Sequence, residues 1–266
     1  MTPVGSLETR GSRSAAPAQL PSFERLVVWG GMTALAAVSW LMLVRLPISA
    51  NMSGTASVMD AGATVWSLHD AWLAFVMWTV MMAAMMLPSA SPTIAMYARI
   101  PRGRNAKRLG YEWLFVAGYL IAWTAFGAAM TAVQYPLERT RMIGDAMRMG
   151  PLAGGLLLIA TGIYQFTPLK RACLSQCRSP LGFFMTKWRS GGGGALRMGL
   201  SHGMFCVGCC WLLMALMFVT GVMSLVWAVA LTAFVLLEKV TPWGDTAARV
   251  SGAVMVVAGV ALAAFG

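Results

Sequence analysis

Long apolar runs dominate this sequence and limit the folds that it can adopt. About 20 consecutive apolar residues are enough for a helix to cross the hydrocarbon core of a bilayer. Hydrophobic residues make up 58% of the 266 positions and charged residues 11%, whereas charged residues make up roughly 25% of a typical soluble domain. The sequence therefore predicts an all-α fold, a polytopic transmembrane helical bundle with no soluble domain.

The apolar runs predict about seven helices. The stretch that begins at Cys206 is too long for a single span, so we divide it near Thr220 and Gly221. The predicted helices cover residues 26–46, 70–88, 111–134, 151–167, 200–220, 222–238 and 246–265. Pro88 is expected to end the second of them. The glycine run at 191–194 is expected to be a flexible joint.

The distribution of Lys and Arg predicts the orientation of the bundle, because short cytoplasmic loops retain basic residues. The N-terminal tail and the loops at 89–110 and 168–199 are basic, whereas the loop at 47–69 has no Lys or Arg. We therefore expect a multi-pass protein of the bacterial inner (cytoplasmic) membrane, with a cytoplasmic N terminus and an outer C terminus. Residues 1–24 form a predicted disordered cytoplasmic tail, and residues 25–266 form a single transmembrane helical domain.

The net charge of +11 comes largely from these loops. A nucleic-acid-binding surface would need basic residues interleaved with aromatic residues, and the loops lack that pattern. The lipid bilayer is thus an expected partner, and nucleic acid is excluded. The sequence contains no Walker loop, dinucleotide fingerprint or zinc-protease motif, so we assign no catalytic or organic-cofactor residues.

Three of the five cysteines and one of the two histidines lie close together in the segment HGMFCVGCCW. At about 100° per residue, His202, Cys206, Cys209 and Cys210 project from one face of a helix, within an arc of roughly 100°. Cysteine also serves as a small apolar residue in packed helices. Four such groups on one stripe nevertheless favour a soft metal ion or a thiol redox couple.

A second pair of thiols, Cys173 and Cys177, lies in the basic loop at 168–199. The reducing cytoplasm disfavours a structural disulfide there. Free thiols in that compartment are more often metal ligands or catalytic groups, although the spacing of this pair is equally consistent with packing.

A stripe of thioethers follows one side of the second predicted helix: Met81, Met82, Met85 and Met86. Such a stripe is either core packing or a set of soft ligands for Cu(I). The second helix ends and the fifth begins on the cytoplasmic side. We therefore expect their inner ends to pack together and bring a thioether near Cys206 or Cys210.

Three polar residues stand near the ends of apolar helices. Glu238 and Lys239 close the sixth helix, where we expect a paired or snorkelling arrangement at the inner interface. Gln165 is expected to hydrogen-bond across helices.

Four motifs carry a family resemblance: MMAAMMLPS, YQFTPLKRACLSQCRSP, HGMFCVGCCWLLM and the later Glu238-Lys239. Together they resemble the bacterial family of predicted metal-binding integral membrane proteins called domain of unknown function 2182. The resemblance covers about residues 70–243 and implies a metal-related membrane protein without an assigned activity. The matching residues are Met81, Met82, Met85, Met86, Pro88, Tyr164, Gln165, Cys173, Cys177, Cys206, Cys209, Cys210, Trp211 and Glu238.

Three functions remain open at this point. The first is a copper-binding integral membrane protein that transports, stores or delivers the metal, together with a metal chaperone or metalloenzyme partner. Cu(I) is favoured over Zn(II) because zinc sites rarely use thioethers. The second is a membrane thiol-disulfide oxidoreductase that uses Cys206 and Cys209. The third is a non-catalytic assembly subunit. The expected metal ligands are Cys206, Cys209, Cys210, His202, Cys173, Cys177, Met81, Met82, Met85 and Met86.

Reporter fusions test the predicted orientation. A reporter joined after Arg108 or after Arg197 should give a cytoplasmic signal, because both positions lie in basic loops. A fusion within the loop at 47–69, which lacks Lys and Arg, is the matched outer control. A periplasmic signal from either basic position would show that the orientation is wrong.

Overall fold

A computed structural model describes residues 29–42, 45, 66–100, 108–140, 142–143, 148–222 and 224–266. The predicted tail at 1–24 lies outside the described residues. A helix at Trp29–Met42 precedes α3 (Leu68–Arg99), α4 (Arg108–Arg139), α5 (Pro151–Gln165), α6 (Pro168–Arg178), α7 (Pro180–Lys187), α8 (Gly191–Ala215), α9 (Met217–Thr220), α10 (Leu225–Val240) and α11 (Gly244–Phe265). The described part of the chain holds no β-strand beyond one isolated bridge, so the predicted all-α fold is confirmed.

Several of these helices suit a membrane. Four are long and apolar enough to span one: Leu68–Arg99, Gly110–Arg139, Gly191–Thr220 and Gly244–Phe265. A fifth candidate is the pair α5 and α6, which is bent by 65°. Each of the seven predicted segments overlaps a helix. The 16 residues of α10, however, extend only about 24 Å, less than the roughly 30 Å of hydrocarbon in a bilayer.

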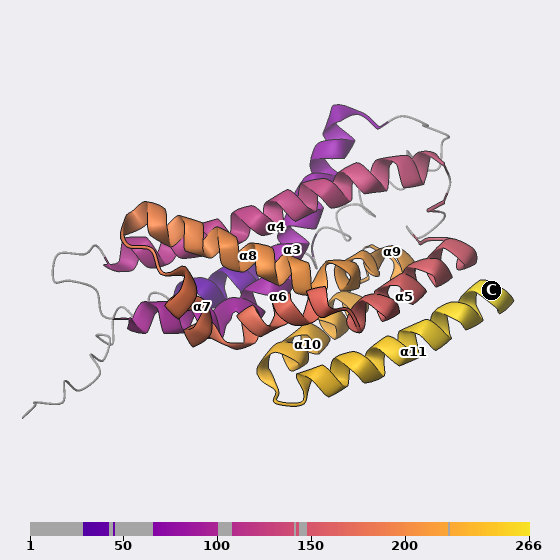
Figure 1. The fold of residues 1–266 in the computed structure, drawn as a ribbon. Coiled ribbons are helices and arrows are strands. Elements are labelled where there is room, and N and C mark those ends of the chain that lie inside the picture. The colour runs from indigo at the N-terminus through magenta and orange to yellow at the C-terminus, as the bar shows by residue number, and fades with distance from the viewer. Residues whose placement is uncertain are drawn as a thin grey trace, which may run out of the picture.

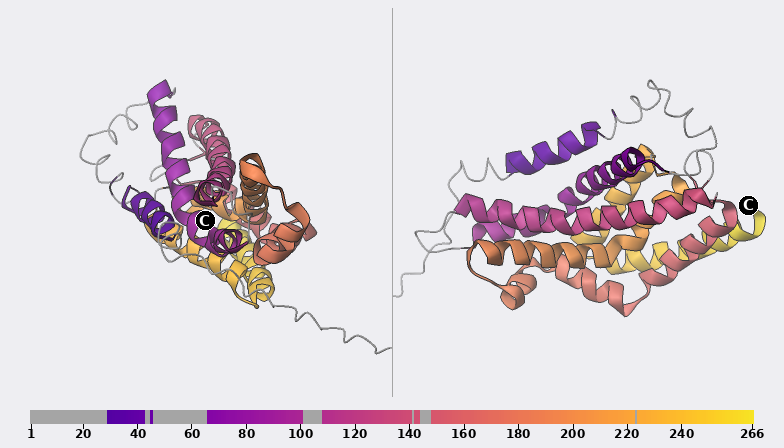
Figure 2. Two further views of the ribbon diagram at one scale, coloured as in Figure 1. Left: turned by 90° about the vertical axis from the view of Figure 1, so that its left-hand side faces the viewer. Right: turned by 90° about the horizontal axis from the view of Figure 1, so that it is seen from above.

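The helices form an elongated bundle (Figure 1). Helix α8 lies along α4, α3 also packs against α4, and α11 lies along α5. A view from above shows α4 beside α8, and Trp29–Met42, in indigo, at the edge of the bundle (Figure 2). The end of α3 and the starts of α4 and α8 share one end of the bundle (Figure 1). These helix ends belong to the basic loops at 89–110 and 168–199, and they share one end of the bundle as expected if both loops face the same side of the membrane.

Pro88 does not end the second helix, contrary to expectation. Helix α3 contains Pro88 and Pro92 and continues to Arg99. Pro92 has no N–H for the carbonyl oxygen of Pro88, and the Ser91 hydroxyl donates to that oxygen instead, at 2.8 Å. A side-chain hydroxyl thus satisfies a carbonyl that proline would leave unpaired in an apolar environment.

Glycines were expected to interrupt the helices near Gly221 and at residues 191–194, and the structure confirms only the first interruption. Gly221 follows α9 with φ +102°, a conformation that favours glycine, so the predicted division of the long apolar stretch is confirmed. Gly191 has φ +80°, but the run from Gly191 to Gly194 forms the first turn of α8 rather than a flexible joint. Helix α8 therefore begins nine residues before the predicted start at residue 200.

Glycines bring α5 and α11 into close contact. A Cβ atom at Gly155 would lie 2.6 Å from the carbonyl oxygen of Gly259, and one at Gly259 would lie 2.7 Å from the carbonyl oxygen of Gly155. Gly162 and Gly252 form a second pair of the same kind. Small residues at such crossings let helix backbones approach each other within a membrane.

A single methyl group should disturb this contact. Gly259→Ala should lower the free energy of unfolding by about 1–3 kcal/mol, because the added Cβ overlaps backbone atoms of α5. Gly193→Ala is the matched control, since a Cβ there meets no atom within 4 Å. Thermal unfolding in detergent measures both. Equal melting temperatures for Gly259→Ala and wild type would show that α5 and α11 are not packed through these glycines.

Candidate metal centre

Helix α8 presents its thiols and imidazole to the interior of the bundle. His202 is 2% exposed, and Cys206, Cys209 and Cys210 are each 1% exposed. The predicted shared face is therefore confirmed. Cys206 lies 15 residues after Gly191, about 22 Å along the helix. The group is thus near the middle of the bundle rather than at its end, because α8 starts earlier than predicted.

A thioether of α3 meets a thiol of α8. The sulfur atoms of Met86 and Cys210 lie 4.0 Å apart, which confirms the predicted approach of these residues. The contact is made at mid-helix, because α3 continues beyond Pro88, so the expected packing of inner ends is wrong. Four methionines of α3, one of α8 and one of α9 are at most 1% exposed: Met81, Met82, Met85, Met86, Met214 and Met217.

The sulfur of Cys206 has two polar neighbours. Lys239 Nζ donates to Cys206 Sγ at 3.0 Å and to Ser89 Oγ at 2.9 Å. The Tyr119 hydroxyl lies 3.1 Å from the same sulfur and 3.0 Å from the carbonyl oxygen of Met86. Lys239 is 7% exposed, so it points into the bundle instead of snorkelling. An ammonium group beside a sulfur offsets the negative charge of a thiolate.

A buried ion pair lies next to this cluster. Lys170 Nζ, at the start of α6, bonds to both carboxylate oxygens of Glu238 at 2.8 and 2.9 Å, and it also donates to Gln165 Oε1. Gln165 Nε2 donates to Ser251 Oγ at 3.3 Å, so the predicted bond between helices is confirmed. Glu238 and Lys239 are thus both paired, one with a lysine and one with a thiol.

Helix α6 brings the remaining two cysteines to the cluster. Cys177 is half-buried and packs against the core cluster that contains Cys206 and Cys209. Cys173, also half-buried, places its sulfur against Gly208 of α8. All five cysteines are free. Two cysteine motifs that lie about 30 residues apart in the sequence therefore come together where α6 packs on α8.

His202 occupies an aromatic cage. Its ring lies 5.3 Å from that of Phe183, 5.9 Å from that of Tyr119 and 6.1 Å from that of Phe115. Within the described part of the chain its Nδ1 atom has no hydrogen-bond partner. A buried nitrogen of this kind costs free energy unless it gains a partner.

The thiols are turned away from a common centre. Cys209 and Cys210 both donate to the carbonyl oxygen of Cys206, at 3.1 and 3.0 Å. Among the described residues no three His, Cys, Asp or Glu side chains are arranged to hold a metal ion. A metal–thiolate bond is about 2.3 Å long, so two sulfurs on one ion lie at most about 4.6 Å apart. The 4.0 Å between Met86 and Cys210 satisfies this limit, whereas the other thiols would need to rotate.

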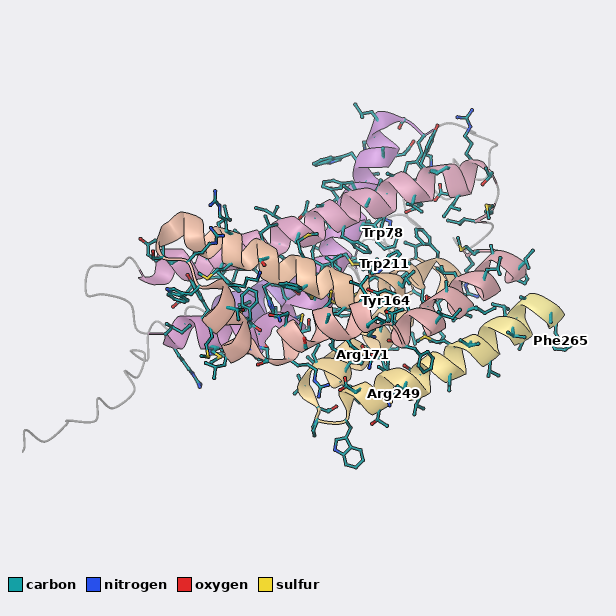
Figure 3. The ribbon with its side chains drawn as sticks, viewed as in Figure 1. Trp78, Tyr164, Arg171, Trp211, Arg249 and Phe265 are labelled. Carbon is teal, nitrogen blue, oxygen red and sulfur yellow. The ribbon has the colours of Figure 1, made fainter. Side chains whose placement is uncertain are left out.

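Sequence reasoning missed several members of the cluster. Tyr119 carries no sequence signal, because single hydroxyl residues are common in apolar helices, and Ser89 ends the motif MMAAMMLPS but was not expected near the thiols. Lys170 lies within the motif YQFTPLK but reads as a loop cation. The rings of Tyr164 and Trp211 meet edge to face, with centroids 5.9 Å apart, where α5 crosses α8 (Figure 3). Both of these residues belong to the motifs that carry the resemblance.

Comparison with known proteins supports a copper-related family. A family model described as "PpoB2: Copper chaperone" matches residues 75–262, which include most of α3 and continue into α11. No curated protein and no solved structure matches the chain. The metal-related family expected from the motifs is thus confirmed, under a description that names copper. Because the match extends over more than half of the 266 residues, the chain belongs to the PpoB2 copper chaperone family.

Proposed function

We propose that this protein binds Cu(I) within the membrane at a sulfur cluster and delivers it to a partner. The observation that carries the proposal is the contact between Met86 Sδ and Cys210 Sγ. It joins a thioether and a thiol that are 124 residues apart in the sequence. Around it lie the thiols of Cys206 and Cys209, and the family description supports copper as the metal.

The ligand set favours Cu(I) over Zn(II). Both ions take thiolates, but thioethers are soft and uncharged ligands that suit Cu(I). Zinc sites usually have four ligands, and the thiols Cys206, Cys209 and Cys210 would need Cys173 or Cys177 to complete them. Cu(I) accepts fewer ligands, so two thiolates and Met86 are enough.

Lys239 prepares the cluster for a cation. Thiolates in a low-dielectric interior are costly unless positive charge lies nearby. The ammonium group of Lys239, 3.0 Å from Cys206 Sγ, supplies that charge in the metal-free protein. His202 is a further nitrogen ligand in reach of the same stripe, since its Nδ1 atom has no partner among the described residues.

Delivery gives the sulfur-lined interior a function. The buried methionines of α3, α8 and α9 extend from the thiols along the bundle, and they offer weak neutral sites between which an ion can exchange. We infer that a metal chaperone or a metalloenzyme supplies or receives the ion. We place the protein in the bacterial inner membrane, with the N terminus in the cytoplasm.

A redox function is the second candidate, and Lys239 favours it too. A cation beside a CxxC thiol is typical of an activated cysteine, and Cys206 and Cys209 have this spacing. Both thiols are 1% exposed, however, so a disulfide partner has no direct access to them. A copper ion, by contrast, can reach the buried thiols by passing between ligands inside the bundle.

Metal analysis tests the copper proposal. Purified protein, reduced and offered equal Cu(I) and Zn(II), should retain copper. The variant Cys206→Ser/Cys209→Ser/Cys210→Ser should lose it, because alcohols are poor ligands for a soft ion. Elemental analysis per chain measures both ions. Retention of zinc by the wild type would favour a structural zinc site. Binding of neither ion, with reversible oxidation of Cys206 and Cys209 in redox buffers, would favour the oxidoreductase.

Replacing the thioether of Met86 should weaken copper binding. Met86→Leu is expected to lower the Cu(I) affinity about tenfold, or roughly 1.4 kcal/mol, while the similar volume of leucine preserves the packing. Met204→Leu is the matched control, because Met204 lies on α8 but is 57% exposed. Competition with a coloured Cu(I) chelator measures the affinities. Equal affinity in the two variants would return Met86 to a packing role.

A further inference from the structure

Helix α6 is attached firmly at both ends. Its first turn is tied to α10 by the buried pair of Lys170 and Glu238. At its last residue, Arg178 Nη1 bonds to Asp245 Oδ1 at 2.9 Å, and Nη2 donates to the carbonyl oxygen of Thr241 at 2.9 Å. The position of α6 on the bundle is therefore well defined, and so are the positions of the two thiols that it carries.

The exposure of the five thiols depends on the helix that carries them. The two on α6 are half-buried, whereas the three on α8 are 1% exposed. Helix α6 also carries exposed polar residues, Arg171 and Ser175, on its outer side. Its thiols thus lie between the polar surface of the protein and the buried cluster.

Cys173, on α6, lies close against the backbone of α8. A Cβ atom at Gly208 would be 2.8 Å from Cys173 Sγ, so a larger residue at position 208 would displace this sulfur. The Tyr164 hydroxyl donates to the carbonyl oxygen of Gly208 and holds the same turn of α8. The next residue is Cys209, whose thiol is buried. The half-buried sulfur of Cys173 therefore lies beside the buried thiols of α8.

We propose that Cys173 is the exchange thiol of this protein, the residue through which Cu(I) enters and leaves the buried cluster. This inference rests on the proposed copper function. A new bond forms between Cu(I) and Cys173 Sγ before the bond to the donor's ligand atom breaks. A bond to Cys209 Sγ then forms before the bond to Cys173 breaks. The oxidation state of copper does not change. Each thiol releases its proton to water or buffer when it binds the ion, and the first regains a proton when the ion leaves.

Loss of an exchange thiol should change the rate of Cu(I) transfer more than the equilibrium affinity for Cu(I). A ligand that only passes the ion on contributes to the speed of loading, while the affinity depends on the residues that hold the ion at equilibrium. Cys173→Ser should therefore slow the transfer of Cu(I) to and from the full-length protein about tenfold or more. Its equilibrium affinity should change by less than about threefold.

The experiment mixes reduced, detergent-purified protein with the coloured bicinchoninate complex of Cu(I) and follows the colour over time and at equilibrium. Cys173→Ser/Ser175→Cys is the matched control. It keeps five thiols and moves one of them two residues along α6, to an exposed position on its outer side. This control should load as slowly as Cys173→Ser. Melting temperatures verify that all variants are folded.

Each outcome decides the question. Slow exchange with preserved affinity, not restored by a thiol at position 175, supports the proposal. An unchanged rate in Cys173→Ser overturns it and leaves the copper function intact. A parallel loss of affinity would instead make Cys173 a ligand of the buried site, and restoration by Ser175→Cys would show that any surface thiol suffices. Wild-type protein that takes up no Cu(I) would overturn both this inference and the proposed function.

Discussion

Two neighbouring residues near the end of α10, Glu238 and Lys239, connect much of the interior. Charged groups are costly inside a membrane protein unless they are paired there, and each of these has a partner on a different helix. Glu238 holds Lys170 of α6, and Lys239 reaches Cys206 of α8 and Ser89 of α3. Removing one partner of a buried ion pair typically costs about 3–5 kcal/mol. The relative positions of α3, α6, α8 and α10 therefore depend on these contacts.

This polar connection also places the sulfur groups. Lys170 lies one turn before Cys173, so fixing the lysine against Glu238 fixes the start of the thiol-bearing helix. Lys239 contacts the sulfur of Cys206 directly. The same two residues thus determine where the thiols of α6 meet those of α8. The charge that stabilises the fold and the charge that accompanies the thiols come from one short segment of α10.

The outer layer of the bundle is assembled in a different way. Helices α5 and α11 meet through glycines whose missing side chains allow backbone contact, and α11 exposes valines on its other face. Such packing depends on the close fit of two helix surfaces rather than on paired charges. Gln165 connects the glycine-packed helices to the polar core, because it hydrogen-bonds to Ser251 of α11 and to Lys170 of α6.

The sequence by itself determined the fold class and the shared face of the four residues on α8. Both follow from local geometry, since hydrophobic length and a period of 3.6 residues operate within one segment. It also indicated a break near Thr220 and Gly221, and the approach of a methionine of the second helix to Cys206 or Cys210. It did not reveal the early start of α8. It also did not reveal that α3 continues through Pro88, because the hydroxyl group of Ser91 compensates for a missing backbone donor.

Only the tertiary structure decided which groups surround the sulfurs. Lys239 reads as an interfacial cation in the sequence, yet its charge has partners from two remote helices and is buried. Tyr119 and Ser89 join the cluster only because α4 and α3 pass beside it. Cys173 and Cys177 approach α8 because the bend between α5 and α6 turns them towards it. These contacts join residues far apart in the chain, and their energies depend on burial, which a local sequence pattern does not encode.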